Sequence, residues 1–224
     1  MVWEYAGRIP AQTPILINCR DRVTPLRDLV DWLEEAGHER IVLIDNDSTW
    51  EPMRDYLHAS PHQVLLEQNH GARAPWVMGI IPQERWVYTD CDVVPIEECP
   101  FDLVDRLDLA LDRYPRYPKA GPGLYLDDVP ADLPSLEWER ELADPRRELE
   151  PGVIGSLIDT TFALYRVQAP DYSAFHYAAI RLGFPYQARH TSWYIDEFDD
   201  ETRHYLSRAD RGVGGSSWAQ QVYS

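Results

Sequence analysis

The sequence predicts an α/β fold built on an open, mostly parallel sheet that is flanked by helices. Short apolar runs alternate with amphipathic, helix-spaced stretches along the first half of the chain. Continuous apolar runs are typical of strands buried on both faces, and parallel strands require a crossover, usually a helix. Seven prolines between residues 114 and 152 break this alternation. We therefore expect one domain with a sheet-based half at 1–113 and a loop-rich half at 114–224.

Each element of the first half follows from a local pattern. Thr24 and Pro25 predict a helix start, since a hydroxyl caps the first turn and proline fixes φ, and Gly37 predicts its end. The run from Ser48 to Glu51 has the pattern of a capping box, which predicts a second helix, and 101–113 predicts another. The expected strands of this half are 14–18, 40–45, 63–67 and 86–89.

The second half gives fewer signals. A strand-like run covers 123–127, and residues 153–165 predict one or two strands. Residues 171–182 predict a helix. No linker separates two cores, so we expect these elements to belong to the same domain as the first half.

Composition excludes several classes of protein. Asp and Glu number 38 against 21 Lys and Arg, for a net charge of −17, and such a surface repels phosphate backbones. General nucleic-acid binding is therefore not expected. The run 76–81 is too short to span a membrane, and residues 1–8 lack the pattern of a signal peptide. An odd number of cysteines without CxxC spacing predicts neither a disulfide framework nor a zinc site, and we expect a cytoplasmic protein.

Polar side chains follow every expected strand of the first half. In open parallel sheets, ligands bind at the carboxyl ends of the strands. Loops are polar in any protein, so the prediction rests on the set and not on single members. The set that predicts one shared ligand site consists of Arg20, Asp45, Asn46, Asp47, Asn69, Arg73, Asp90 and Asp92.

Asp90 and Asp92 form the sharpest element of this set. They flank Cys91 directly after an apolar run, where two carboxylates can turn toward one cation. Hard oxygen ligands suit Mg²⁺ or Mn²⁺, which in turn binds a diphosphate. An Asp-x-Asp pattern alone is weak, and the preceding strand strengthens it.

These segments resemble glycosyltransferases of the GT-A fold that use nucleotide-sugar donors, near family 2. The resemblance covers residues 15–95 and rests on 15–20, 41–49, 67–71 and 87–94. It implies a UDP- or GDP-sugar donor and a Mn²⁺ or Mg²⁺ cofactor. It further implies that Asp45 and its neighbours contact the nucleoside, that Arg20 and Arg73 line the nucleotide site, and that Asp90 and Asp92 bind the metal.

The second half departs from the common family pattern, since the Glu-Asp pair of inverting members is absent. Asp159 and Asp196 are our candidate catalytic carboxylates, and inversion or retention stays open. His190 is the candidate third metal ligand, and a satisfied core or surface histidine is the alternative. We also expect substrate contacts from Trp193, Asp127 and Asp128, for which a core aromatic and solvated acids are the alternatives.

The expected function is metal-dependent transfer of a sugar from a nucleotide donor to an unknown acceptor. One alternative is a nucleotidyltransferase acting on a sugar phosphate. That class predicts a glycine-rich basic loop after the first strand, whereas residues 18–22 contain no glycine. A second alternative is a binding module that holds a nucleotide sugar without turnover.

Overall fold

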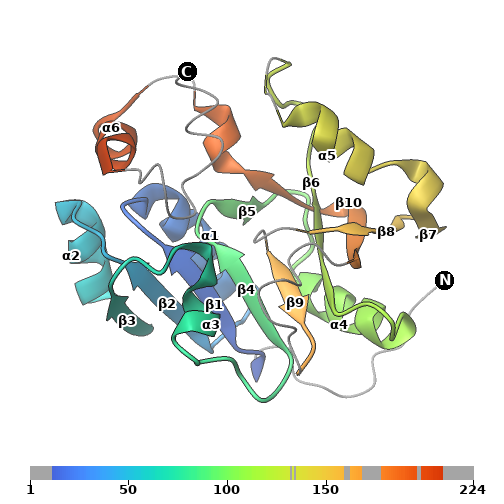
Figure 1. Cartoon of the computed structure of the whole chain (residues 1–224), viewed down its shortest axis with the longest axis horizontal. Coiled ribbons are helices and arrows are strands. Elements are labelled where there is room, and N and C mark those ends of the chain that lie inside the picture. The colour runs from blue at the N-terminus through green and yellow to red at the C-terminus, as the bar shows by residue number, and fades with distance from the viewer. Residues whose placement is uncertain are drawn as a thin grey trace.

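The structure is a computed structural model that describes residues 12–131, 133, 135–158, 162–167, 178–195 and 198–208. Within these residues one ten-stranded sheet runs through the molecule in the order β3-β2-β1-β4-β9-β6-β10-β8-β7, and β5 pairs with the end of β10 (Figure 1). The strands are β1 (Ile15–Cys19), β2 (Ile41–Asn46), β3 (Gln63–Glu67), β4 (Trp86–Asp90), β5 (Val93–Pro95), β6 (Lys119–Leu124), β7 (Glu148–Glu150), β8 (Val153–Leu157), β9 (Ala163–Tyr165) and β10 (Ala178–His190).

The first four strands confirm the expected parallel arrangement. β1 pairs in parallel with β2 and β4, and β2 pairs in parallel with β3. β9 then runs antiparallel between β4 and β6, while β6 and β10 are parallel to each other. The sheet is therefore mixed from β9 onward. It is parallel across β3, β2, β1 and β4, where the polar strand ends lie together.

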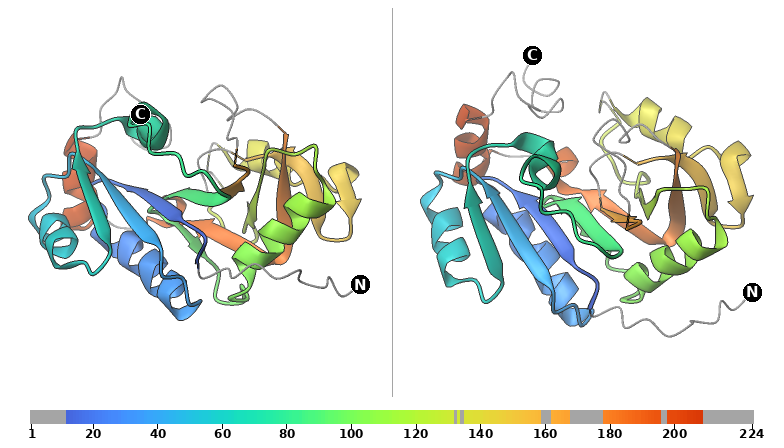
Figure 2. Two further views of the ribbon diagram at one scale, coloured as in Figure 1. Left: turned by 90° about the horizontal axis from the view of Figure 1, so that it is seen from below. Right: turned by 60° about the horizontal axis from the view of Figure 1, so that its bottom comes forward.

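Helices cover both faces of the sheet, and their bounds are α1 (Val23–Glu35), α2 (Glu51–Ala59), α3 (Ala74–Val77), α4 (Leu103–Arg113), α5 (Leu136–Leu142) and α6 (Asp200–Arg208). α1 and α4 lie along one face, and α3 lies on the other (Figure 2). Three short 3₁₀ turns, η2 (Gly71–Arg73), η3 (Pro145–Arg147) and η5 (Thr191–Tyr194), complete the described secondary structure. None of the described helices is long and apolar enough to cross a membrane.

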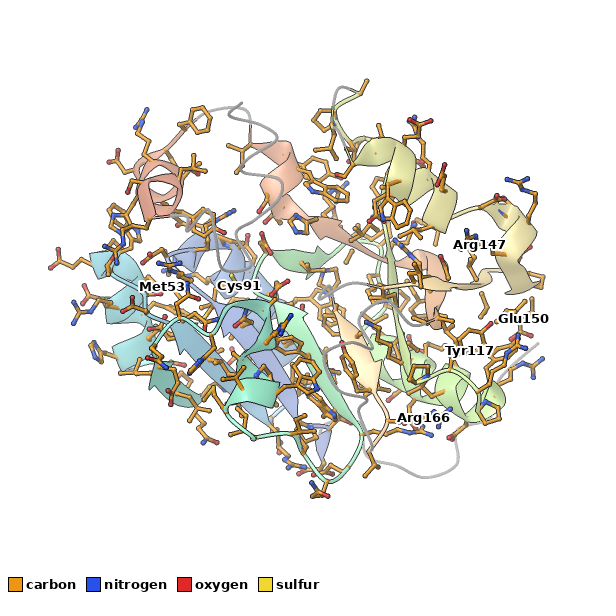
Figure 3. The ribbon with its side chains drawn as sticks, viewed as in Figure 1. Met53, Cys91, Tyr117, Arg147, Glu150 and Arg166 are labelled. Atoms are coloured by element: carbon orange, nitrogen blue, oxygen red, sulfur yellow. The ribbon has the colours of Figure 1, made fainter. Side chains whose placement is uncertain are left out.

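Two cores fill the two faces. The larger core joins α1, α2 and α4 to the sheet, and Met53 and Cys91 both belong to it (Figure 3). Arg166, after β9, donates to the carbonyl of Tyr117 (2.8 Å) between α4 and β6 and to the carbonyl of Leu111 in α4, which ties the chain after β9 to this helix (Figure 3). The smaller core centres on Trp86, which stacks on Tyr165 with ring centroids 5.0 Å apart.

Several local expectations are wrong. Residues 178–182, expected in a helix, form the start of β10, and 171–177 lie outside the described residues. The expected strand at 123–127 ends at residue 124, and the loop-rich stretch 114–152 contains β6, α5 and β7. The capping box also fails: Trp50 is the N-cap of α2 and its side chain makes no cap hydrogen bond.

Asp105 in the first turn of α4 gives a stability prediction. Burial, together with the nearby Asp102 and Asp108 carboxylates, raises the pKa of Asp105 to about 6. The folded protein therefore holds this proton more tightly than the unfolded chain does, and the free energy of unfolding falls as pH rises from about 4 to about 6. We expect Asp105→Asn to raise the free energy of unfolding at pH 8 by about 1 kcal/mol, a value discounted for the half-exposed site.

Urea unfolding at pH 8 and pH 4 measures this effect. We expect the increase in the free energy of unfolding caused by Asp105→Asn to be absent at pH 4. Asp108→Asn is the matched control on the same helix, because Asp108 accepts a hydrogen bond from Arg85 Nη1 at 2.5 Å. That variant lowers the free energy of unfolding at pH 8. Equal destabilisation by both variants would contradict the prediction.

Candidate functional site

The carboxyl ends of β1, β2 and β4 bring the first-half candidates to one edge of the sheet. In the parallel registers Cys19 lies beside Asp45, and Asn18 lies beside Asp90. Successive side chains of a strand point to opposite faces, so the predicted set divides between the two faces. Asp45 lies on the face of the larger core, next to Cys19, and Asn46 on the face of α3.

Asp45 and Asp21 form a buried acidic pair on the α1 face. Asp45 Oδ2 accepts the Ser48 amide (3.2 Å), while its Oδ1 is buried without a hydrogen-bond partner among the described residues. Burial raises the pKa of Asp45, and the nearby Asp21 and Asp47 charges add to that effect. A buried carboxylate oxygen without a hydrogen-bond partner is rare in proteins, which singles out Asp45 among the predicted site residues.

Asp21 explains why the expected capping box is not used. Its side chain is fully buried, and Oδ1 accepts the amides of Thr49 (2.6 Å) and Trp50 (2.7 Å). The Asp21 amide in turn donates to Ser48 Oγ (2.9 Å). A carboxylate from the loop after β1 therefore satisfies the amides that precede α2, and the two loops are fixed to each other.

A chain of amide side chains links the ends of β1, β2 and β4 on the α3 face. Asn46 Nδ2 donates to Asn18 Oδ1, and Asn18 Nδ2 donates to Asp90 Oδ1 (3.2 Å). Asn46 Oδ1 accepts the amide of His70 (3.0 Å). Because this amide precedes η2, Asn46 also sets the position of the turn that carries Arg73.

Asp92 lies in the turn between β4 and β5 and meets residues from the other end of the chain. Its Oδ2 accepts a hydrogen bond from Ser192 Oγ, and its Oδ1 lies 3.9 Å from His190 Nε2. Burial by itself raises the pKa of this carboxyl, but His190, Arg22 and the Ser192 hydroxyl together outweigh burial and lower it. Asp92 is therefore an ionised carboxylate at neutral pH.

The predicted metal triad of Asp90, Asp92 and His190 is not assembled as a metal-binding group in the described residues. The described part of the chain holds no group of three or more His, Cys, Asp or Glu side chains that could bind a metal. Asp90, the third member of the triad, is bonded to Asn18 instead. Asp92 and His190 alone supply one carboxylate and one imidazole, so most ligands of a divalent cation would have to come from a bound diphosphate and water.

The predicted arginines occupy different environments. Arg20 follows β1 and is half-buried, and its Nε is enclosed without a hydrogen-bond partner in the described residues. Arg73 closes η2 and is exposed, as is Asp47, whose φ of 63° places it in the left-handed region. The two predicted arginines therefore do not share one environment, and the role of each at the strand ends remains a prediction.

The candidate substrate contacts from the second half divide into two groups. Trp193 of η5 stacks on His190 with ring centroids 5.0 Å apart, so it lies beside the Asp92 site. Asp128 is exposed and accepts hydrogen bonds from Arg189 Nη2 (2.6 Å) and the Tyr194 hydroxyl (2.9 Å). Asp127 is also exposed. The two candidate catalytic carboxylates, Asp159 and Asp196, lie outside the described residues.

Sequence reasoning missed four residues that build this site: Asn18, Asp21, Arg22 and Ser192. All four act through partners that are far away in the chain, for example 170 positions between Arg22 and Ser192. The sequence signal that could have found three of them is the polar run 18–22 after an apolar strand. This run is typical of a loop that faces a ligand, but it does not show what each residue contacts.

Comparisons with known proteins leave the family open. No protein-family model and no curated protein sequence matches the chain. One similar solved structure is a cytidylyltransferase from Leptospira borgpetersenii serovar Hardjo-bovis, with TM-score 0.39 and 11% identity, covering 70% of this chain and 60% of that one. Another is a UDP-glucose pyrophosphorylase complexed with UDP-glucose, with TM-score 0.47 and 12% identity, covering 87% of this chain and 98% of that one. Likeness at this level assigns no activity to the chain.

Proposed function

We propose that the protein is a transferase that binds a nucleoside diphosphate sugar at the carboxyl ends of β1, β2 and β4 and transfers the sugar to an acceptor. The observation that carries this proposal is the contact between Asp92, after β4, and His190, at the end of β10. This carboxylate and imidazole lie at the sheet edge where β1 also ends, just before Arg20, and the set supports a site for a cation-bound diphosphate.

Each part of the ligand has a matching group in the proposal. Asp45 Oδ1 accepts a donor group of the nucleoside, and Arg20 binds a phosphate oxygen. Asp92 and His190 would contribute ligands to Mg²⁺ or Mn²⁺, and the cation would neutralise the charge that develops on the leaving diphosphate. Trp193 offers an aromatic face near the sugar.

Nucleotidyl transfer to a sugar phosphate is the second candidate. It is the activity class named for the two similar structures, although their low similarity does not assign that activity to this chain. The loop after β1 argues against nucleotidyl transfer, because only residues 20–22 separate β1 from α1 and none of them is glycine. Such a short loop offers few backbone amides to a triphosphate.

Thermal-shift titration with UDP, GDP and dTDP, each with Mn²⁺ or with EDTA, tests the proposed site. A ligand at about 100-fold excess over its Kd raises the free energy of unfolding by about 2.7 kcal/mol. We expect one nucleotide to produce a cation-dependent rise in Tm. No rise with any nucleotide, with or without Mn²⁺, would refute the site.

Product analysis then separates the two activities. Incubation with the matching nucleotide sugar releases nucleoside diphosphate if the sugar is transferred, either to an acceptor or slowly to water. Incubation of the nucleoside triphosphate with a sugar phosphate releases pyrophosphate if nucleotidyl transfer occurs. Pyrophosphate release alone would reject glycosyl transfer in favour of the second candidate.

A further inference from the structure

The helix α6 is docked by polar side chains. Its buried residues are Glu201 and Thr202, only 8% and 6% exposed. α1, α2 and α4 each contribute buried apolar residues to the larger core, whereas neither core includes a residue of α6 among the described residues. Because apolar burial is the main favourable contribution to helix docking, α6 is held more weakly than these three helices.

Glu201 fixes α6 to the start of α1. Its Oε2 accepts hydrogen bonds from the Thr24 amide (3.2 Å) and the Thr24 hydroxyl (2.9 Å), and its Oε1 lies 3.7 Å from Arg22 Nε. The Tyr205 ring lies over the Arg22 guanidinium, with 5.2 Å between Cζ and the ring centroid. Burial, with the nearby Asp199 charge, outweighs the contacts of Glu201 and raises its pKa, so the ionised carboxylate is docked at an energetic cost.

His204, one turn further along α6, contacts the loop after β2. Its Nε2 lies 2.9 Å from Thr49 Oγ1, and its ring packs on Trp50 with centroids 5.0 Å apart. The same nitrogen lies 3.8 Å from Oδ2 of Asp21, the carboxylate that accepts the amides of Thr49 and Trp50. α6 therefore lies beside α2 and spans the junction between the loops after β1 and β2 (Figure 1).

This junction is connected to Asp45 at the end of β2. The Asp21 amide donates to Ser48 Oγ (2.9 Å), and the Ser48 amide donates to Asp45 Oδ2 (3.2 Å). Thr49, which contacts His204, follows Ser48 directly in the chain. The position of α6 and the position of the Asp45 carboxylate are therefore linked through one short loop.

We propose that α6 is a latch: it opens from the loops after β1 and β2 as one unit while the sheet stays folded, and nucleotide binding at these loops favours its closed position. The second clause rests on the proposed function, and the first does not. With nine residues, α6 is too short to be a stable helix in water by itself, so an open α6 loses its backbone hydrogen bonds. Opening also releases Thr49 and Trp50 from His204, which frees the loop that follows Asp45.

Hydrogen exchange of the full-length protein without any ligand, in low concentrations of urea, tests the opening. We expect α6 amides to exchange with a lower free energy of opening, and with a weaker dependence on urea, than α1 amides. α1 is the reference because its apolar residues belong to the larger core. Equal free energies and equal urea dependence for α6 and α1 would show that α6 opens only on global unfolding, and would overturn the latch.

Two variants separate local opening from global unfolding. Thr24→Val removes the hydroxyl that binds Glu201 and retains the shape of the side chain, so we expect α6 amides to exchange at least about fivefold faster. Val30→Ala weakens the larger core through α1, so it speeds the exchange of α1 amides and leaves α6 amides unchanged. Arg203→Gln is the control on α6, because Arg203 is exposed and pairs with Asp200, and it leaves α6 exchange unchanged. Equal acceleration of α6 and α1 by Val30→Ala would contradict a separate opening.

Exchange in the presence of UDP or GDP, whichever raises the Tm with Mn²⁺, tests the coupling. If the open form does not bind the nucleotide, exchange of α6 slows by the factor 1 + [L]/Kd, which is about 100-fold at about 100-fold excess over Kd. We expect α6 amides to exchange at least about tenfold more slowly than in the free protein.

The outcomes distinguish the latch from the proposed function. If UDP or GDP binds and α6 amides exchange as fast as in the free protein, the coupling is overturned and the nucleotide site is retained. If no nucleotide binds, the coupling and the proposed function fail together, and exchange without ligand still decides whether α6 opens separately. If Thr24→Val does not fold, the wild-type protein and Val30→Ala decide.

Discussion

Asp92→Asn is expected to abolish the cation-dependent part of nucleotide binding and to lower kcat/KM at least about 100-fold. The amide is nearly isosteric with the carboxylate, but it cannot supply the negative charge that a divalent cation requires. In the variant, the cationic Arg22 loses the ionised carboxylate that lowers its electrostatic cost. Both changes oppose the binding of Mg²⁺ or Mn²⁺.

Thermal shift with Mn²⁺ and the matching nucleotide, repeated with EDTA, measures this loss. Asp31→Asn is the control, because Asp31 is exposed on α1 and its replacement changes the net charge by the same amount. The control retains the full cation-dependent rise in Tm. A rise of wild-type size in Asp92→Asn would place the cation elsewhere in the molecule.

Trp86→Ala is expected to produce the largest loss of stability, about 4 kcal/mol. Trp86 is fully buried at the centre of the smaller core. It stacks on Tyr165, and Trp76 packs against it with ring centroids 5.6 Å apart. Removal of the indole leaves a large cavity between strands β4 and β9 that the surrounding rings cannot fill.

Urea unfolding followed by far-UV circular dichroism measures the effect. Trp86→Phe retains an aromatic ring and removes an indole N–H that is buried without a partner in the described structure, so it costs far less than the alanine variant. Trp138→Ala is the control, since Trp138 is exposed on α5 and its loss changes the free energy of unfolding by about 0.5 kcal/mol or less. Equal effects of the Trp86 and Trp138 alanine variants would contradict the assignment of Trp86 to the core.

The parallel part of the sheet was predictable because β1, β2 and β4 are largely buried on both faces. β1 and β2 read as unbroken apolar runs that end in polar residues, and this pattern has few alternatives. The start of β10 was not predictable in the same way. Residues 178–182 combine alanines with spaced apolar residues, a pattern that fits a buried strand and a helix equally well, and pairing with β6 and β8 decides between them.

The sequence predicts that the candidate site lies at the strand ends. It does not predict which side chains contact one another there. Asp92 and His190 were expected near one another, and the structure places them 3.9 Å apart. The cap of α2 was assigned to Ser48 because capping rules are local, whereas Asp21 in another loop accepts the amides before this helix. The partners of Arg22 cannot be inferred from the residues around it.

The contacts of Arg22 and Thr24 with α6 also bear on when the site forms during synthesis. Thr24 and Glu201 are separated by 177 positions in the chain, so the ribosome must release nearly all described residues before their hydrogen bond can form. The buried residues of the larger core all precede the end of β10, whereas two contacts of the proposed site, from Ser192 and Glu201, come later in the chain. A nascent chain that stops after His190 thus contains every strand of the sheet and lacks both Ser192 and Glu201. We therefore expect a nascent chain of this length to form the sheet before the proposed site is complete.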